Sequence, residues 1–263
     1  LFQGYQFTFG TAYDKAPTGW ADKLSTKITS MTEEELHFWL AQIPKMREWL
    51  GPRQVRNMAA YEYKLKNKHY ELTEELDLNK VNDDKHGFFG AQVIPMMAAQ
   101  AKKHPDYLLR DVLRTGQSTT IWDGQNFFDA AHPINKFPGG GTSATQRNYW
   151  SSNKALSYDN AVDVRSTMML LKGEDGEPLG VNPNLMVVPP QLGPLARTIA
   201  QAEFAPKAYG TLGSESAATV QPNSLRGTFE VLELPELGAD TTTWYFMDVS
   251  KPIKPLIFQE RQA

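Results

Sequence analysis

The strongest constraint on the fold is a stretch of alternating apolar and polar residues between positions 55 and 79. Two alternating runs flank Asn67 and Lys68, and asparagine tolerates the left-handed backbone of a tight hairpin turn. The sequence therefore predicts a long two-stranded hairpin with its turn at these two residues. A slip of one residue would move every apolar side chain to the charged face, so the register is well defined. The apolar face of this hairpin carries Tyr61, Tyr63, Leu65, Tyr70 and Leu72.

The apolar face of the predicted hairpin needs a cover. Roughly eleven residues per strand, at about 3.3 Å each, give an arm on the order of 35 Å long. Two strands alone are only marginally stable in water. We therefore expect a neighbouring subunit to bury this face.

The segments before the hairpin give mixed signals. Residues 1–30 contain isolated aromatic side chains without a sustained helical period, which predicts an extended arm. Thr32 followed by three glutamates resembles a capping box, so a helix is expected that ends before Pro44. A second short helix is expected over 45–50.

The segments after the hairpin indicate a long helical region. Residues 82–84, Asn-Asp-Asp, predict the start of a helix that runs to about residue 103, with Pro95 as a kink or break. Another helix is expected from His104 and Pro105, ending at Gly116.

The remainder mixes helices and strands, which makes the chain α+β. A strand or turn is expected at 119–123, and loops rich in small polar residues are expected at 133–156 and 209–226. Ser157 is expected to cap a helix that runs to about residue 171. Further elements are a helix at 192–204 and strands at 185–188, 228–234, 243–249 and 255–259.

Composition excludes several classes of protein. The 27 Lys and Arg against 30 Asp and Glu give a net charge of −3, which argues against a dedicated nucleic-acid binder. The absence of cysteine excludes disulfides, thiol nucleophiles and cysteine-ligated metal sites. The longest apolar runs are too short to cross a bilayer, so no membrane partner is expected.

The densest cluster of potentially catalytic residues lies at 122–133. Asp123, Asp129 and His132 could ligate a metal or form an acid–base set, as in a soluble metal-dependent hydrolase. The alternative, which we favour, is a turn at Asp123 followed by an extended segment at His132. No HExxH pattern or second histidine at ligand spacing accompanies these residues. We therefore expect no enzymatic activity, no cofactor and no metal.

The remaining candidate sites are better explained by structural roles than by ligand binding. Asp83 and Asp84 are better explained by helix capping than by a cation site, and the glycines at 139–141 by a mobile loop than by a phosphate cradle. The alternating lysines near the predicted hairpin tip favour a solvated or intersubunit face over nucleic-acid binding. These lysines are Lys64, Lys66 and Lys68.

Taken in order, these motifs resemble the major head subunit family of Mu-like tailed phages. The resemblance runs over about 45–205 and rests on several motifs in combination. The motifs are Met46 to Arg53 (MREWLGPR), Tyr61 to Tyr63 (YEY) with Asn67 and Lys68, Asn82 to Asp84 (NDD) with Gly87, Asp123 to Asp129 (DGQNFFD) with His132 and Pro133, and Leu185 to Pro190 (LMVVPP) with Ala196 and Arg197.

The resemblance implies a Hong Kong 97-like phage capsid fold. It assigns 1–50 to an N-terminal arm with short helices and 51–82 to an extended β-hairpin loop. It assigns 83–135 to the long spine helix and peripheral domain, and 136–263 to the axial domain with returning peripheral strands.

The function implied is that of a major capsid protein, which self-assembles into the icosahedral head shell around phage double-stranded DNA. Hexamers and pentamers of the chain are the expected homo-oligomers. Scaffold, portal and decoration proteins are possible further partners, and packaged DNA is contacted non-specifically. The expected location is the virion, after assembly in the cytoplasm of the bacterial host. A second set of intersubunit contacts is expected from the arm, through Phe7, Phe9, Tyr13 and Trp20.

Overall fold

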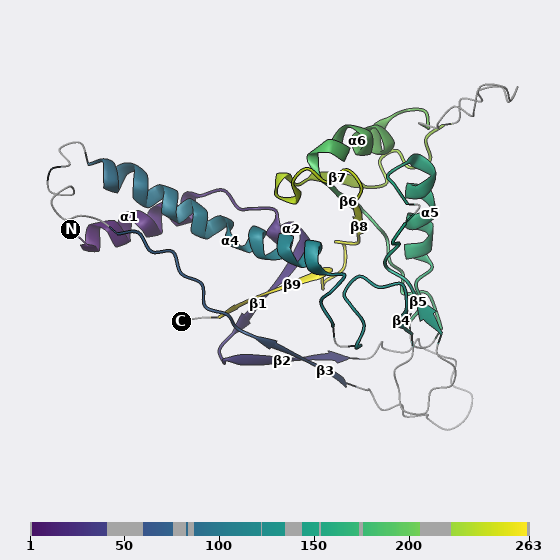
Figure 1. The fold of residues 1–263 in the computed structure, drawn as a ribbon, viewed down its shortest axis with the longest axis horizontal. Coiled ribbons are helices and arrows are strands. Elements are labelled where there is room, and N and C mark those ends of the chain that lie inside the picture. The colour runs from purple at the N-terminus through teal and green to yellow at the C-terminus, as the bar shows by residue number, and fades with distance from the viewer. Residues whose placement is uncertain are drawn as a thin grey trace, which may run out of the picture. The chain divides into compact units, whose positions relative to one another are not determined.

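The computed structural model (Figure 1) describes residues 2–40, 60–75, 83, 87–121, 123–134, 144–152, 154–173, 176–205 and 222–261. The chain divides into two compact units. The first unit comprises 1–34, 66–111 and 256–263, and the second comprises 35–65 and 112–255.

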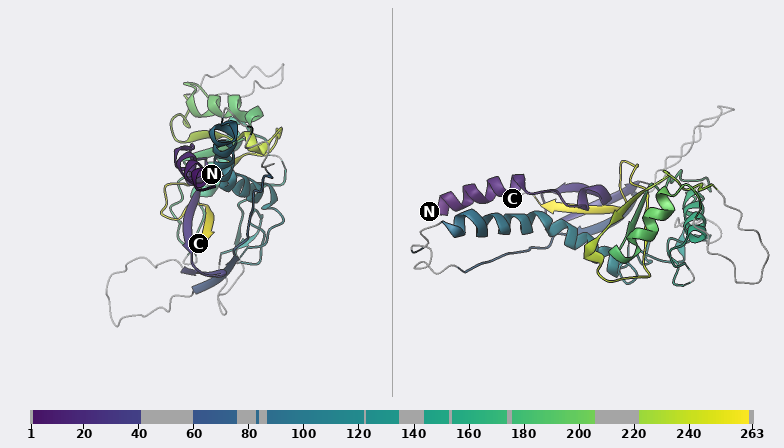
Figure 2. Two further views of the ribbon diagram at one scale, coloured as in Figure 1. Left: turned by 90° about the vertical axis from the view of Figure 1, so that its left-hand side faces the viewer. Right: turned by 90° about the horizontal axis from the view of Figure 1, so that it is seen from above.

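Two helices lie side by side in the first unit (Figure 2). They are α1, Phe2–Lys15, and α4, Ile94–Thr115, whose last turn belongs to the second unit. The Nζ atom of Lys102 on α4 lies 4.5 Å from the centre of the Tyr13 ring on α1. A Cβ atom added to Gly90 would lie 3.4 Å from the ring of Tyr5. Tyr5 and Tyr13 therefore lie on the face of α1 that meets the helical segment 89–115.

The predicted extended arm is wrong for its first half, because Phe2–Lys15 is helical. Tyr5, Phe9 and Tyr13 recur at steps of four, which places them on one helical face. Packing of this face against α4 outweighs the low helix propensity of the two glycines in α1. The period of four was readable in the sequence, but Phe7 and the glycines obscured it.

The spine region is a single helix after a short π-helical segment. The π segment η1, Phe89–Val93, leads directly into α4, and no break occurs at His104 or Pro105. The predicted second helix start at 104 is therefore wrong. Pro95 falls just after the change from π to α geometry, where its missing N–H removes one helical hydrogen bond. The helix ends before Gly116, as predicted.

The predicted cap at 82–84 does not begin this helix. Asp83 lies in a turn, Asp84 is outside the described residues, and helical structure begins only at Phe88.

The first unit also contains a parallel pair of strands, β1, Ser25–Ser30, and β9, Leu256–Arg261. The register places Ser25 opposite Leu256 and Ser30 opposite Arg261. The predicted strand at 255–259 is thus confirmed, and its partner comes from the segment predicted to be an extended arm. The two strands of this sheet come from near the two opposite ends of the sequence.

A buried carboxylate joins the short helix α2, Ala21–Leu24, to α4. Asp106 is only 2% exposed, and its Oδ1 accepts a hydrogen bond of 2.8 Å from the backbone N–H of Ala21. The carboxylate packs so closely on Gly19 that a Cβ atom there would lie 1.9 Å from Oδ2. The spine helix therefore supplies the N-terminal hydrogen bond that Trp20, the N-cap residue of α2, does not provide.

A two-stranded ribbon is present, but its strands differ from the predicted ones. It pairs β2, Glu34–Leu40, with β3, Ala60–Lys66. The capping-box helix from Thr32 is therefore wrong, and the Thr32 hydroxyl donates to the carbonyl oxygen of Glu34 at 2.6 Å. Alternation in Glu34–Leu40 suits a strand as well as a helix, and pairing with β3 decides between them.

The hairpin turn at Asn67 and Lys68 is also wrong. Residues 67–75 belong to no strand, and the backbone N–H of Asn67 donates to the carbonyl oxygen of Glu33 at 3.1 Å. The short helix predicted at 45–50 lies outside the described residues.

The second unit is built around a three-stranded sheet in the order β7-β6-β8. Strand β6, Leu185–Val188, is fully buried; β7, Glu230–Glu233, runs parallel to it and β8, Tyr245–Met247, antiparallel. Helices α5, Tyr158–Met169, and α6, Gly193–Gln201, complete the core with 3-10 turns η2, Pro190–Leu192, and η3, Pro235–Leu237. The core side chains include Leu156, Tyr158, Met186, Val188, Ile199, Leu225 and Phe229.

Local signals predicted the helices and strands between residues 157 and 249 well. The side chain of Ser157 accepts a hydrogen bond from the backbone N–H of Asn160, so it caps α5 as expected. The strand at 185–188 has the predicted bounds, while the strands at 228–234 and 243–249 and the helix at 192–204 are present with shorter bounds. A short antiparallel pair, β4, His132–Pro133, and β5, Thr145–Gln146, lies within the predicted loop region. Among the described residues, no helix combines the length and apolarity needed to span a membrane.

We predict that Asp106→Ala lowers the free energy of unfolding by about 1–3 kcal/mol, because the buried N–H of Ala21 loses its acceptor. Asp106→Asn keeps an acceptor oxygen and should cost less. Urea unfolding followed by circular dichroism measures both. Asp111→Ala is the matched control on the same helix, since its side chain is largely exposed and should change stability by less than about 0.5 kcal/mol. Equal losses of stability at positions 106 and 111 would contradict a stabilising role for the hydrogen bond between Ala21 and Asp106.

We predict that alkaline pH destabilises the fold partly through Tyr245. Burial raises the pKa of its hydroxyl from 10.0 to about 12, and that hydroxyl donates to the carbonyl oxygen of Leu113 at 3.1 Å. The unfolded chain therefore loses this proton first, and stability falls as the pH rises from about 10 towards 12. The melting temperature of Tyr245→Phe should fall less steeply over this interval than that of the wild type. Parallel curves would show that Tyr245 does not contribute.

Candidate functional site

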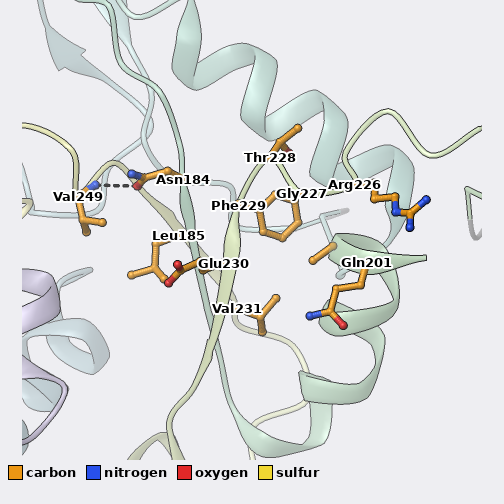
Figure 3. A pocket seen from close by; sticks show the side chains of 11 residues that line it. Asn184, Leu185, Gln201, Arg226, Gly227, Thr228, Phe229, Glu230, Val231 and Val249 are labelled. Carbon is orange, nitrogen blue, oxygen red and sulfur yellow. Dashed lines mark hydrogen bonds between the residues drawn. The ribbon is translucent and has the colours of Figure 1, made fainter. Parts of the chain in front are cut away.

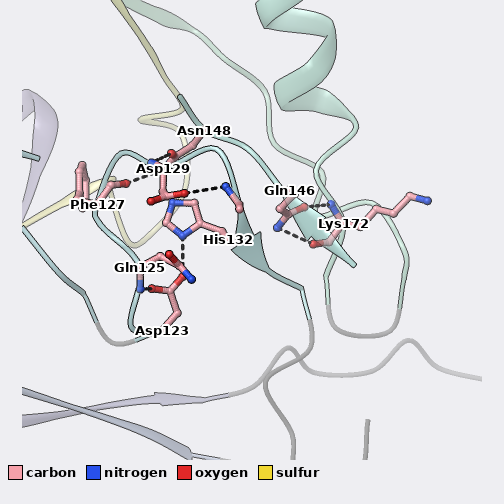
Figure 4. Close-up of polar contacts among 9 residues, drawn as sticks. Asp123, Gln125, Phe127, Asp129, His132, Gln146, Asn148 and Lys172 are labelled. Carbon is pink, nitrogen blue, oxygen red and sulfur yellow. Dashed lines mark hydrogen bonds and ion pairs between the residues drawn. The ribbon is translucent and has the colours of Figure 1, made fainter. Parts of the chain in front are cut away.

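The cluster of potentially catalytic residues forms a braced loop in the second unit (Figure 4). Oδ1 of Asp123 accepts a hydrogen bond from the backbone N–H of Gln125 at 2.9 Å, and Gly124 adopts a φ of 83°. Oδ2 of Asp123 lies 2.6 Å from Nδ1 of His132. The turn predicted at Asp123 is confirmed, and its second carboxylate oxygen holds the far end of the loop.

Asp129 does not join this pair. Its Oδ1 accepts from the backbone N–H of Ala131 at 2.9 Å, while its own N–H donates to Oδ1 of Asn148 at 2.8 Å. The Asn148 amide also donates to the carbonyl oxygen of Phe127 at 2.7 Å. The carboxylate thus closes a local turn.

The loop has the features of a structural support. The side chains of His132 and Asp123 are 13% and 4% exposed, so the pair is largely shielded from solvent. Among the described residues, no group of three His, Asp or Glu side chains could hold a metal ion. Gly116 fixes the start of the segment, because a Cβ atom there would lie 2.6 Å from the ring of Phe128.

A second brace joins β5 to the turn that follows α5. Oε1 of Gln146 accepts from the backbone N–H of Lys172 at 3.0 Å, and Nε2 donates to its carbonyl oxygen at 3.2 Å (Figure 4). The side chain thereby pairs with the backbone in the way that a neighbouring strand would.

An open cavity of about 850 Å³ lies beside the three-stranded sheet (Figure 3). Its walls come from the start of β6, the start of β7, the end of α6 and residues 226–229. Oδ1 of Asn184 is already used by the backbone N–H of Val249 at 2.9 Å. The remaining polar lining is Gln201, Arg226, Thr228 and Glu230. The Thr228 hydroxyl donates to the carbonyl oxygen of Leu225 at 2.8 Å, so it is not paired with a base that could activate it.

The residues predicted to form the apolar face of the hairpin are now divided between two segments. Tyr61, Tyr63 and Leu65 lie in β3; Leu65 is half-buried, and the side chains of the two tyrosines are outside the described residues. Tyr70 and Leu72 lie in the unpaired segment 67–75 and are 55% and 53% exposed. The Tyr70 ring lies 4.5 Å from that of His104. The pairing of Leu65 with Tyr70 across a turn is therefore absent.

The predicted contact residues of the arm also have different environments. Phe9 and Tyr13 stack with ring centres 6.2 Å apart, and Trp20 is half-buried beside α2. Phe7 points away from this face and is 77% exposed. Among the predicted contact residues whose side chains are described, the exposed ones are Phe7, Tyr70 and Leu72.

The remaining candidate sites from the sequence, the lysines near the predicted hairpin tip and the glycines at 139–141, give no ligand site among the described residues. Lys66 forms an ion pair with Glu33, and the glycines at 139–141 lie outside the described residues. The sequence did not indicate the roles of Asp106 and Asn67, whose partners lie 85 and up to 192 residues away. No local signal could have identified them.

Comparisons with known proteins point to one family. The model of the family described as "Mu-like prophage major head subunit gpT" matches residues 1–152, 141–237 and 234–263. The major capsid protein of Escherichia phage Mu is 31% identical over 134 residues, covering 51% of this chain and 43% of that protein. The Mu-like prophage FluMu major head subunit of Haemophilus influenzae is 27% identical over 161 residues, covering 61% and 52%. The chain thus spans about half the length of these curated relatives.

Solved structures share the fold. The capsid of bacteriophage JBD30 matches with a TM-score of 0.64 and 23% identity, over 85% of this chain and 92% of that chain. The procapsid of the same phage matches with a TM-score of 0.64 and 24% identity, over 89% and 97%. These matches confirm the predicted α+β capsid fold.

The aromatic helix pair, the ribbon, the braced loop and the buried strand β6 thus occur in a chain matched by one family model from residue 1 to residue 263. The matched relatives are head subunits, which are structural proteins and not enzymes. The chain belongs to the family of Mu-like prophage major head subunits.

Proposed function

We propose that many copies of this chain self-assemble into the icosahedral head shell that encloses phage double-stranded DNA. The observation that carries the proposal is the family match over 1–152, 141–237 and 234–263. Hexamers and pentamers are the oligomers that such a shell requires.

The ribbon supports an assembly role on physical grounds. A ribbon of two strands is only marginally stable without a covering surface. In the described part of the chain, β2 and β3 pair with each other and with no third strand. We propose that an adjacent subunit covers this ribbon through Tyr61, Tyr63 and Leu65.

Exposed apolar side chains provide a second kind of contact. Leu72 and Phe7 each place a large apolar side chain in solvent, where burial contributes about 25 cal/mol for each Å² removed from water. Each contact is modest, but closed symmetry repeats it around the shell. We propose that both residues, with Tyr70, contact neighbouring subunits.

The burial of three of the predicted arm residues changes which of them we expect to contact another subunit. Phe9, Tyr13 and Trp20 are packed within the first unit, so a contact of theirs with another subunit would first require rearrangement. We propose that the N-terminal contact is made chiefly by Phe7.

The wider setting follows from the same proposal. We place the protein in the virion, assembled in the cytoplasm of the bacterial host, with scaffold, portal and decoration proteins as further partners. One JBD30 structure carries minor capsid protein trimers as decoration. A net charge of −3 is compatible with a container that holds its DNA non-specifically. We retain the division into arm 1–50, extended loop 51–82, spine and peripheral domain 83–135 and axial domain 136–263 as a proposal.

We predict that Leu72→Glu abolishes shell formation and leaves the subunit folded. The leucine is exposed, so the free energy of unfolding should change by less than about 0.5 kcal/mol. A charge placed in a subunit contact would have to be desolvated at each repeated copy. Sedimentation velocity and negative-stain electron microscopy measure the assembled fraction.

Thr73→Glu is the matched control for this variant. It adds the same charge at the neighbouring position, where the native side chain is polar and exposed, so no apolar contact is lost. Shells are expected from this control. Shells from Leu72→Glu at the wild-type yield would contradict the proposed contact.

A further inference from the structure

We infer that Asn67 is a positioning residue that fixes the root of the ribbon formed by β2 and β3. Its backbone N–H donates to the carbonyl oxygen of Glu33 at 3.1 Å. Its Nδ2 donates to Oγ of Ser30 at 2.9 Å and to the carbonyl oxygen of Thr32 at 2.8 Å. Its Oδ1 accepts from Nε2 of Gln259 at 2.8 Å. One side chain thus uses both its donors and its acceptor.

The partners of Asn67 come from separate segments of the first unit. Ser30 is the last residue of β1, is fully buried, and donates its hydroxyl to the carbonyl oxygen of Thr32 at 3.0 Å. Gln259 lies in β9, opposite Ile28 of β1. The amide therefore fastens the end of the parallel strand pair to the turn that follows β1.

The position of this amide gives it control over the ribbon. Strand β2 begins at Glu34 and β3 ends at Lys66, so the chain enters and leaves the ribbon beside Asn67. The hydrogen bond from the backbone N–H of Asn67 to the carbonyl oxygen of Glu33 joins the residue just before β2 to the residue just after β3. A two-stranded ribbon has little stability of its own, so the pairing of β2 with β3 depends on how firmly the chain is held at Glu33 and Asn67.

A nearby ion pair does not provide the same restraint. Nζ of Lys66 lies 3.3 Å from Oε1 of Glu33, but the two side chains are 65% and 72% exposed. Exposed pairs of this kind contribute little, because water screens the charges and two long side chains must be ordered. The neutral amide is therefore the main restraint at the root.

We call Asn67 and its hydrogen-bond partners Ser30, Thr32 and Gln259 the Asn67 node. The hydrogen bonds of this node require an asparagine. Aspartate has nearly the same shape, but an ionised carboxylate has no donor for Ser30 or for the carbonyl oxygen of Thr32. It would also place a negative charge against that carbonyl oxygen. Asn67→Asp therefore removes the donors and preserves the volume, which separates hydrogen bonding from packing.

This inference rests on the proposed function, because a contact repeated by symmetry needs the ribbon to leave every subunit in one direction. Its test begins with the unassembled full chain. Hydrogen exchange followed by mass spectrometry is measured for peptides that cover 25–33, 60–70 and 256–261. Asn67→Asp should accelerate exchange in these peptides about tenfold, as expected for the loss of more than one hydrogen bond. Lys66→Ala is the matched control and should exchange like the wild type.

Two further readouts keep the test decisive. If Asn67→Asp does not fold, Gln259→Ala removes one hydrogen bond of the node and should give a smaller acceleration in the same peptides. Unchanged exchange in the folded variants would overturn the inference. Shell yield then tests positioning: Asn67→Asp should lose shells while Lys66→Ala keeps them. Accelerated exchange with wild-type shells would reduce Asn67 to a purely structural role and overturn the positioning claim.

The two proposals fail in different ways. A wild-type chain that never forms shells would contradict the proposed function, whatever the exchange rates show. A wild-type chain that assembles, with unchanged exchange in Asn67→Asp, would contradict only the role of the amide.

Discussion

The buried carboxylate of Asp106 makes the contact on which the first unit most depends. This unit is assembled from three segments that are far apart in the sequence, so local propensity alone cannot hold it together. Asp106 joins the spine helix to the N-terminal segment through Ala21, and β9 then pairs with the strand that follows. A carboxylate with 2% exposure can remain buried only where hydrogen bonds satisfy it. The N-terminal segment is therefore fixed from one side by a polar contact and from the other by a strand.

The sequence predicted the helices and strands between residues 157 and 249 better than the rest of the chain for a physical reason. The cap at Ser157 and the apolar run of β6 are local signals, and the structures they specify depend mainly on nearby residues. The helix predicted from Thr32 also had a good local signal, but pairing with β3, more than 20 residues later, selected a strand. Asn67 likewise carried a turn signal, and its distant partner Gln259 gave it another role.

The candidate sites were predictable to different degrees. The turn at Asp123 followed from the aspartate and glycine alone, but its contact with His132 depends on how the loop closes. Leu72 is exposed together with its neighbours on both sides, so exposure does not follow the alternation, and the strand pairing inferred from the same pattern was wrong. Alternation reports that side chains point to opposite sides of an extended chain, and it does not identify the partner. The structure of the ribbon therefore could not be derived from that pattern alone.

On the proposed function, the arrangement suits a subunit that stays separate before it assembles. Phe7, Tyr70 and Leu72 are exposed, whereas Phe9 and Tyr13 are partly buried and stack on each other within the subunit. Small separated apolar surfaces give weak contacts between two copies, and these become strong together only when symmetry engages several at once. Such contacts require that each surface has a fixed direction. On the proposed function, the polar nodes at Asp106 and Asn67 provide that direction, and the apolar side chains provide the free energy of association.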